Sequence, residues 1–337
     1  MAQNFIDPSA KIGANCVIAD SAKIGANCVI GDNVKIGENC EIGAGVTIGK
    51  NCEIGAGVTI GIGSTIGAGV TIGTGSTIGD GVKIANRCKI GDNNEIWHGC
   101  LIGGSPLSIN DPTSYSLVIG NGNKIHPMVF IYGNTKIGDG NEIWDCCIIG
   151  LPSQHIGYHR YPGKVIIGNN NDIRSRCQID AGNNYGSREK PELLDYITEK
   201  RAVSEDVTEV GDNCSLLNCV TVHHNCHVGL GDIPGSRKKE YNTVICANCC
   251  LNGFVHVYKG CELSSGTFVR EWMAIGPGGF TAMAAKVVKN VPPFMMILEH
   301  DFHKMAYWRM REFGLDPVDI SSIAYYPLDS NKQYVAK

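Results

Sequence analysis

The chain has 337 residues, of which 43 are glycine and 16 are cysteine, and its formal net charge is −4. Glycine follows no three-residue period, which excludes collagen, and the charge argues against a broadly basic surface, so we expect no nucleic acid partner. No run approaches the ~18 apolar residues of a membrane span, and residues 1–8 do not resemble a secretion signal, so we expect a cytoplasmic protein with no transmembrane segment.

The first hundred residues repeat with a period of six. Isoleucine occupies every sixth position from Ile6 to Ile102, and a small residue follows each isoleucine four positions later, as at Cys16. Such a period is typical of a parallel β-helix, in which each hexad supplies one short strand and one corner. Residues 1–103 are therefore expected to form a β-helix without inserted loops, which we interpret as a spacer or a trimer-forming extension.

Cysteine is one of these small residues, because it alternates with Ala, Val and Ser at the same hexad position. A thiol fills a small apolar position well, and cytoplasmic thiols normally stay reduced. We therefore interpret the cysteines as interior residues and not as a disulfide framework.

The hexads break and resume along the rest of the chain. The later blocks are 119–149, 167–179, 210–228 and 245–287. Counting all hexads gives about twelve coils, and the segment 89–97 recurs at 136–144, which indicates an internal duplication. A purely structural coil has no need of long interruptions, so we expect the loops between the blocks to carry function. The loops expected to line a site are 150–164, 180–209 and 229–242.

The hexads end after residues 291–293. The apolar residues between His303 and Phe313 are spaced three or four apart, which predicts an amphipathic helix ended by Gly314 that covers the open end of the coil. A helical turn is also expected at 192–197. The sequence thus divides by role into a loopless extension, 1–103, a β-helix with loops that carry the active site, 104–293, and a short helical segment, 294–337.

A resemblance to a known family rests on the histidine-rich segment 216–229 and on other motifs in the same order. The other matching motifs are 135–144, Ile149-Gly150, 165–168, 171–174, 251–253, 274–276 and 291–293. Together they resemble the hexapeptide-repeat acyltransferases, and most closely the UDP-N-acetylglucosamine O-acyltransferases of lipid A biosynthesis. The resemblance covers about residues 124–315.

This resemblance implies an all-β fold, a left-handed parallel β-helix, in a homotrimer with active sites between neighbouring protomers. It implies that an acyl or hydroxyacyl group passes from acyl carrier protein to a hydroxyl of a UDP-amino sugar. Acyl carrier protein and a sugar nucleotide are the expected partners. No tightly bound cofactor is expected, since acyl-carrier-protein or acyl-coenzyme A thioesters act as co-substrates.

The reaction needs a base for the acceptor and a donor for the oxyanion. Histidine is a suitable base near neutral pH, and His224-Asn225-Cys226 matches the family's catalytic motif, so we expect His224 to be the base. The family's oxyanion donor, a backbone N–H, corresponds to Gly253. Gln154 corresponds to a contact with the sugar nucleotide.

Several residues depart from the family's pattern and leave the acceptor open. The residues expected to bind substrate are Gln154, His155, Tyr158, Asn252, His256, Arg270, Met283 and Arg311. His155 and Phe254 replace polar residues of the family, and Arg270-Glu271 replaces a His-Gln pair. Met283 stands near a position that is glycine in long-chain members, so its volume predicts a shorter acyl chain.

Other interpretations of the same residues remain. Acyl transfer from coenzyme A to an amine of a nucleotide-linked amino sugar is the second hypothesis, and a non-catalytic scaffold is the third. A weaker hypothesis is a zinc site, formed if histidines of adjacent coils meet, namely His223, His227 and His256. It is weaker because the sequence lacks the histidine motif of the hexapeptide carbonic anhydrases. We therefore expect no metal, and interpret these three histidines as structural or peripheral.

Overall fold

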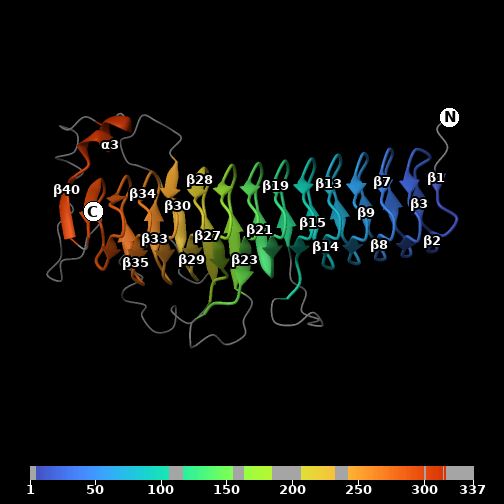
Figure 1. Cartoon of the computed structure of the whole chain (residues 1–337), viewed down its shortest axis with the longest axis horizontal. Helices are drawn as coiled ribbons and strands as arrows, with labels where there is room; N and C mark the ends of the chain where they lie inside the picture. The colour runs from blue at the N-terminus through green and yellow to red at the C-terminus, as the bar shows by residue number, and fades with distance from the viewer. Residues whose placement is uncertain are drawn as a thin grey trace. The chain divides into compact units, whose positions relative to one another are not determined.

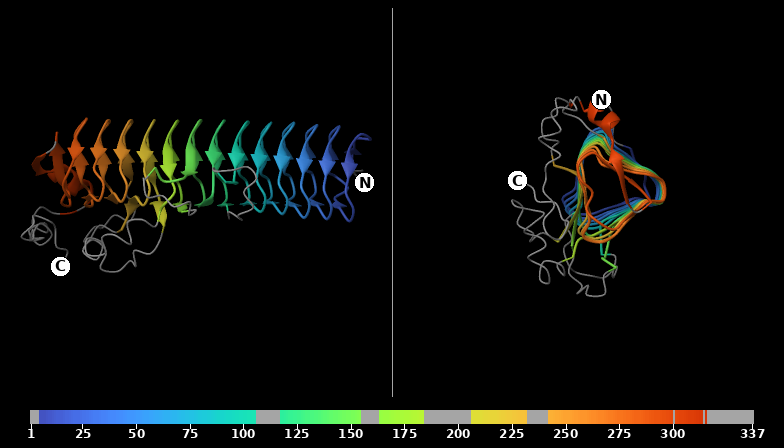
Figure 2. Two further views of the ribbon diagram at one scale, coloured as in Figure 1. Left: turned by 90° about the horizontal axis from the view of Figure 1, so that it is seen from below. Right: turned by 90° about the vertical axis from the view of Figure 1, so that its left-hand side faces the viewer.

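A computed structural model describes most of the chain (Figures 1 and 2). The described residues are 5–105, 117–154, 163–183, 206–231, 242–299, 301–313 and 315. They belong to two compact units, of which the first comprises Met1–Leu151 with Asn169–Arg176 and the second Pro152–Gly168 with Cys177–Lys337.

The first unit consists of short parallel strands. They are β1 (Phe5–Ile6), β2 (Lys11–Ile12), β3 (Val17–Ile18), β4 (Lys23–Ile24), β5 (Val29–Ile30), β6 (Lys35–Ile36), β7 (Glu41–Ile42), β8 (Thr47–Ile48), β9 (Glu53–Ile54), β10 (Thr59–Ile60), β11 (Thr65–Ile66), β12 (Thr71–Ile72), β13 (Thr77–Ile78), β14 (Lys83–Ile84), β15 (Lys89–Ile90), β16 (Glu95–Ile96), β17 (Leu101–Ile102), β18 (Val118–Ile119), β19 (Lys124–Ile125), β20 (Phe130–Ile131), β21 (Asn134–Ile137), β22 (Glu142–Ile143), β23 (Ile148–Leu151) and β25 (Asp172–Ile173).

Each strand pairs in parallel with the strand three further along the chain, so that Ile6 pairs with Ile24 and Ile24 with Ile42. Within this unit the three sheets have the orders β1-β4-β7-β10-β13-β16-β19-β22-β25, β2-β5-β8-β11-β14-β17-β20-β23 and β3-β6-β9-β12-β15-β18-β21. Three hexads therefore complete one turn, and the end-on view in Figure 2 shows the three-sided coil.

The hexad sequence explains this geometry. The repeated isoleucine and the small residue four positions later are buried, as Ile24 and Cys28 are. The residue three positions after the isoleucine adopts a positive φ, as Asn27 (56°) and Gly45 (68°) do. Asn and Gly tolerate this left-handed conformation better than other residues, which is why they recur at the corners.

The expectation that the cysteines form no disulfide framework is confirmed, because all sixteen are free, and the expected interior position holds for the eleven that are buried. Burial raises the pKa of the Cys88 thiol to about 12, so this group stays protonated at neutral pH. Four cysteines at corners or on outer faces are not interior residues, namely Cys146, Cys219, Cys246 and Cys250.

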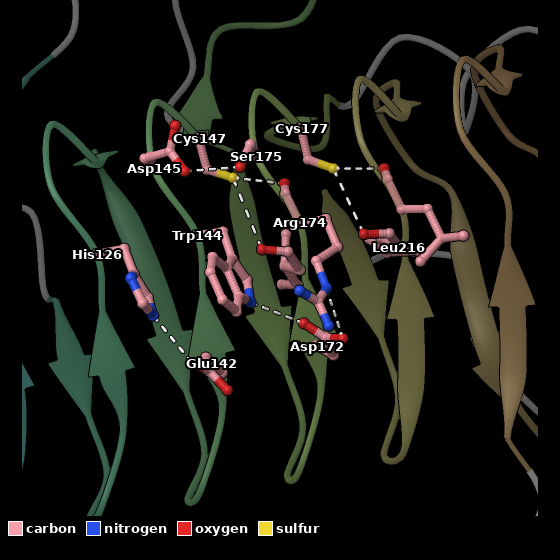
Figure 3. A network of polar contacts seen from close by, with 12 residues as sticks. His126, Glu142, Trp144, Asp145, Cys147, Asp172, Arg174, Ser175, Cys177 and Leu216 are labelled. Carbon is pink, nitrogen blue, oxygen red and sulfur yellow. Dashed lines mark hydrogen bonds and ion pairs between the residues drawn. The ribbon is translucent and has the colours of Figure 1, made fainter.

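One corner of the first unit carries a stack of flat side chains, which Figure 3 shows in part. The His126 ring lies 4.5 Å from the Trp97 ring and 4.3 Å from the Trp144 ring. The Arg174 guanidinium covers the other face of Trp144 at 4.5 Å. Glu142 contacts His126 Nε2 at 2.9 Å, and Asp172 accepts hydrogen bonds from Trp144 and Arg174. We call these four stacked residues the tryptophan column; each directly follows the buried isoleucine of its hexad.

The second unit has the same organisation. Its elements are β24 (Lys164–Ile167), β26 (Gln178–Asp180), β27 (Val207–Val210), β28 (Cys214–Leu216), β29 (Thr221–Val222), β30 (His227–Leu230), β31 (Thr243–Ile245), β32 (Cys250–Leu251), β33 (His256–Tyr258), β34 (Glu262–Leu263), β35 (Phe268–Val269), β36 (Ala274–Ile275), β37 (Phe280–Thr281), β38 (Lys286–Val287), β39 (Met295–Leu298), β40 (Asp301–Met305) and helix α3 (Tyr307–Glu312). The sheet orders within it are β26-β29-β32-β35-β38, β24-β27-β30-β33-β36 and β28-β31-β34-β37-β39-β40.

The C-terminal helix is shorter than the spacing of apolar residues predicts. The expected helix from His303 is wrong in its first part, because β40 pairs antiparallel with β39 there, with Leu298 opposite Asp301. The edge of β39 presents unpaired backbone groups, and a returning strand satisfies them. Helix α3 follows, and Met310 and Phe313 pack with Phe294 in the buried core.

The expected fold class, a left-handed parallel β-helix of hexapeptide repeats with a short C-terminal helix, is confirmed. Strands β1 to β38, three to a turn, agree with the count of about twelve coils. The helical turn expected at 192–197 and Gly314 lie outside the described residues. The division by role at residues 103 and 293 stays a prediction. Within the described parts of the chain, no helix is long and apolar enough to cross a membrane.

Candidate active site

The regular parallel register of the second unit brings the histidine motif and the Leu-Asn-Gly motif to one corner. Strand β29 pairs with β26 and with β32, and β32 pairs with β35, so the turns after these four strands lie on successive coils. We call this the His224 corner. Its turns contain residues 180–181, 223–225, 252–254 and 270–272.

His224 is the central side chain of this corner. It is buried, with 7% of its surface exposed. Its Nδ1 lies 3.1 Å from Asn225 Oδ1, and since a carbonyl oxygen only accepts, the ring donates from Nδ1. This tautomer makes Nε2 the basic nitrogen of the imidazole, which suits a general base.

Gly253 lies beside the ring on the next coil. A Cβ atom added at Gly253 would lie 2.6 Å from His224 Nε2, so only glycine leaves room for the imidazole in this position. The turn therefore places a backbone amide next to the basic nitrogen.

The amide of Gly253 is also open. At several other corners an aspartate or asparagine of the following coil accepts the N–H at this hexad position, as Asp32 does from Ala14 and Asn86 from Ala68. On the coil after Gly253 this position is Glu271, and the Gly253 N–H has no hydrogen-bond partner within the described residues. An open amide beside a basic nitrogen can stabilise a developing oxyanion.

A buried amide network fixes Asn225. Its Oδ1 accepts from the backbone N–H of Asn183 at 2.8 Å, and its Nδ2 donates to the backbone carbonyl of Asn183 at 2.9 Å. The Asn183 side chain donates to Ser153 Oγ at 2.6 Å. This network connects the turn of His224 to the segment that bears Gln154, which is exposed. Asn183 and Ser153 could not be found from the sequence, because neither belongs to a recognisable motif.

A second histidine at the corner has an acidic partner that sequence analysis missed. The carboxylate of Asp180, fully buried, accepts a hydrogen bond from His223 Nδ1 at 2.8 Å. Hydrogen bonds to Asp180 and then to Cys250 raise the pKa of His223 to about 9. The hexad pattern could have indicated Asp180 as this partner. Asp180 directly follows the buried Ile179 and therefore holds the same hexad position as His223.

Two aromatic residues form the remaining wall. The Phe254 and Trp272 rings stack in parallel with centroids 3.8 Å apart, and the Phe254 ring meets the His224 ring edge to face at 5.1 Å. Both residues adopt a positive φ, 62° and 64°, where most corners carry Asn or Gly. Bulky residues hold this conformation at a cost of about 1–3 kcal/mol each, so the surrounding packing enforces it.

The structure brings only some of the expected residues together. Asn252 and the exposed Arg270 lie at the His224 corner with His224 and Gly253. The ring of His256 stacks on His227 at 4.7 Å, on the face formed by β30 and β33. Met283, 75% exposed, lies at a different corner, after β37, and Arg311 is exposed on α3. His155 and Tyr158 lie outside the described residues.

The zinc hypothesis for the three histidines finds no metal-binding group. Among the described residues, no cluster of three or more His, Cys, Asp or Glu side chains could hold a metal ion. His223 instead pairs with Asp180, and His227 Nδ1 lies 3.4 Å from Glu209 Oε2.

The repeats match a known family. The family described as bacterial transferase hexapeptide (six repeats) matches at residues 15–50, 27–62, 51–86, 69–104 and 116–151. Residues 15–104 and 116–151 thus consist of repeats similar to those of this family. The matched repeats cover the coils of the first unit, which contain no part of the His224 corner.

Curated relatives of this chain are acyltransferases by name. The acyl-[acyl-carrier-protein]–UDP-N-acetylglucosamine O-acyltransferase of Albidiferax ferrireducens is 29% identical over 168 residues, 49% of this chain and 53% of that protein. The protein of the same name from Aliivibrio salmonicida is 33% identical over 146 residues, 43% of this chain and 44% of its own length. The chain thus spans about half the length of the relatives it matches.

Solved structures with a similar coil include a UDP-N-acetylglucosamine acyltransferase of Bacteroides fragilis. It is 17% identical, with a TM-score of 0.48, over 98% of this chain and 84% of that chain. The corresponding Francisella novicida enzyme is 23% identical, with a TM-score of 0.45, over 95% and 77% of the two chains.

Proposed function

We propose that this hexapeptide-repeat protein is an acyltransferase that moves an acyl or hydroxyacyl group from acyl carrier protein to a hydroxyl of a UDP-amino sugar. The names of its relatives support the reaction class and both partners. The observation that carries the proposal is the His224 ring against the open amide of Gly253. In this proposal the site functions in a homotrimer, as the family resemblance implies.

The chemistry follows from this pair of groups. A thioester is already activated, so the protein must remove the acceptor's proton and stabilise the charge that forms on the carbonyl oxygen. His224 Nε2 removes the proton, and Asn225 holds the ring in the required tautomer. The Gly253 N–H donates to the oxyanion. Phe254 and Trp272 exclude water from one side of the base.

One assay tests the reaction and its acceptor. The purified chain is incubated with UDP-N-acetylglucosamine and acyl carrier protein loaded with acyl chains of graded length. A parallel reaction contains acetyl-coenzyme A and a nucleotide-linked sugar with a free amine. Acylated UDP-N-acetylglucosamine in the first reaction supports the proposal, product only in the second assigns the site to N-acylation, and no product in either contradicts an acyltransferase.

The control uses the regular repeats. His98 occupies the same hexad position as His224, two residues after a buried isoleucine, and is exposed on the first unit. If His224 is the base, His224→Ala removes activity and His98→Ala does not.

A further inference from the structure

The proposed reaction leaves His223 without a role, although the chain holds this side chain firmly. Asp180, which accepts its Nδ1–H, is completely buried and is bound a second time by Gln178 Nε2 at 2.7 Å. A buried carboxylate without a partner is strongly unfavourable, so the hydrogen bond to Asp180 fixes the orientation of the His223 imidazole. With Nδ1 bound to Asp180, the remaining ring nitrogen, Nε2, faces away from that carboxylate.

The other groups around His223 come from the next coil. Its backbone N–H donates to the Leu251 carbonyl, and Cys250 and Asn252 flank that residue. The sulfur of Cys250 accepts a hydrogen bond from the imidazole, which contributes to the raised pKa of His223, so the ring already donates to one sulfur atom. Arg270 follows one coil further on at the same hexad position and is exposed. Asp180 is the acidic group that pairs with the ring.

The two adjacent histidines therefore reach the same coil. The His224 ring lies against Gly253, and His223 holds the same hexad position as Asn252, the residue before Gly253. A thioester carbonyl whose oxygen meets the Gly253 N–H would have its leaving sulfur within this small area. His223 is paired with a carboxylate and carries a proton at neutral pH, since its pKa is about 9.

Acyl transfer from a thioester has two proton steps, and the proposed function accounts for one. The acceptor loses a proton when it attacks the carbonyl carbon, and the thiolate needs one when it leaves. Alkyl thiols have a pKa of roughly 8.5, so expulsion of a bare thiolate near neutral pH is slower than expulsion with proton transfer.

We infer that His223, held by Asp180, is the general acid that protonates the leaving sulfur of the acyl donor. This inference rests on the proposed acyltransferase function. In the step, the tetrahedral intermediate re-forms its carbonyl, the carbon–sulfur bond breaks, and the electron pair stays on sulfur. The Nε2 proton of His223 moves to that sulfur, while the proton of the acceptor stays on His224. Exchange with solvent then restores both rings. His223 is a catalytic residue in this step, and Asp180 is a positioning residue.

A leaving-group series separates this role from a structural one. The same acyl group is supplied as an alkyl thioester of pantetheine and as a thioester of thiophenol, whose thiolate leaves without help. We expect His223→Gln to lose about 10²-fold in kcat with the pantetheine ester, as removal of a general acid does, and far less with the thiophenol ester. An equal loss with both esters would overturn the inference. His126→Gln, which removes the paired histidine of the tryptophan column, should leave the ratio unchanged.

The pH profile tests Asp180. We expect wild-type kcat with the pantetheine ester to fall as pH rises through about 9, where His223 loses its proton. Asp180→Asn should move this alkaline limb toward the ordinary histidine pKa near 6.5. Because the asparagine can still accept the hydrogen bond from His223, this variant also serves as the test if His223→Gln folds poorly. An unmoved limb in Asp180→Asn contradicts the inference.

Two further outcomes keep the inference distinct from the proposed function. If wild type transfers no acyl group from either ester, the function itself fails and the role of His223 fails with it. If wild type is active but Cys250→Ala abolishes turnover and an acylated Cys250 accumulates in wild type, the sulfur at His223 is a nucleophile of the protein, and the general-acid role is wrong. Full activity of Cys250→Ala supports it.

Discussion

Two columns of side chains occupy the same hexad position in the two units and have opposite surroundings. In the tryptophan column His126 pairs with Glu142 and is enclosed by the rings of Trp97 and Trp144. At the His224 corner His223 pairs with Asp180, and its neighbours on the next coil are the small side chains of Cys250 and Asn252. A histidine paired with a carboxylate at this hexad position can thus be enclosed between aromatic rings, as in the tryptophan column, or lie beside the proposed catalytic base, as at the His224 corner.

The two columns also differ in the residue that follows each histidine. Pro127 follows His126, whereas His224 follows His223. The coil after His224 offers Gly253, which leaves space for the ring and an open amide. The comparison teaches that a paired imidazole by itself does not mark a site in this fold. The proposed site differs by the glycine on the next coil, which leaves room for the His224 ring beside a backbone amide.

The largest effect is expected when the base is removed. His224→Ala should reduce kcat by about 10²–10⁴-fold, the usual contribution of a general base. His98→Ala, at the same hexad position of the first unit, should retain wild-type activity. Steady-state rates with a saturating acyl donor measure both. Comparable rates for His224→Ala and wild type would remove the basis for placing chemistry at this corner.

The next effect concerns the glycine. Gly253→Ala places a Cβ 2.6 Å from His224 Nε2, so the ring must move and activity should fall by about 10²-fold, as expected for a displaced catalytic group. Thr74→Ala is the control, because Thr74 holds the same hexad position and is exposed. A Gly253→Ala protein with normal kcat and a normal melting temperature would show that the close approach has no catalytic meaning.

The ion pair of His223 should make stability depend on pH. Its raised pKa means that the pair stabilises the folded state fully below about pH 6.5, the ordinary histidine value, and that this contribution is lost as pH rises through about 9. Urea unfolding at a series of pH values should therefore show wild-type stability declining across this range. In His223→Gln the decline should be smaller by about 1.5–3 kcal/mol, the range for hydrogen bonds to charged groups. Identical pH slopes would contradict the pairing.

The smallest effect is expected far from the His224 corner. Met283→Gly should extend the longest acyl chain that is transferred, because the exposed methionine side chain would no longer block an acyl groove. Met128→Gly, which removes another exposed methionine side chain (47%) in the first unit, should leave the chain-length profile unchanged. Competition among acyl carrier proteins of graded chain length reads out both variants. An unaltered profile in Met283→Gly would exclude a role in chain-length selection.

The interruptions of the hexads limited what could be predicted. The period predicted strands wherever it was unbroken, since the buried isoleucine and the left-handed corner are local properties of each hexad. The helical spacing of apolar residues failed at residues 303–305, where the chain forms a strand that pairs with the edge strand β39 instead of a helix. The spacing of apolar residues cannot report an unsatisfied strand edge, because that edge is created by the chain before it.

The sequence by itself determined the coil, the inward cysteines and, through the family resemblance, the choice of His224 and Gly253. Only the tertiary structure decided that Asp180 binds His223, that Asn183 fixes Asn225, and that Phe254 and Trp272 stack beside the base. The hexad repeats within six residues and is readable along the chain. The contacts listed above, in contrast, join residues on different coils. Which residues meet depends on the register between coils, and that register depends on the lengths of the intervening loops, so the partners cannot be read from a single hexad.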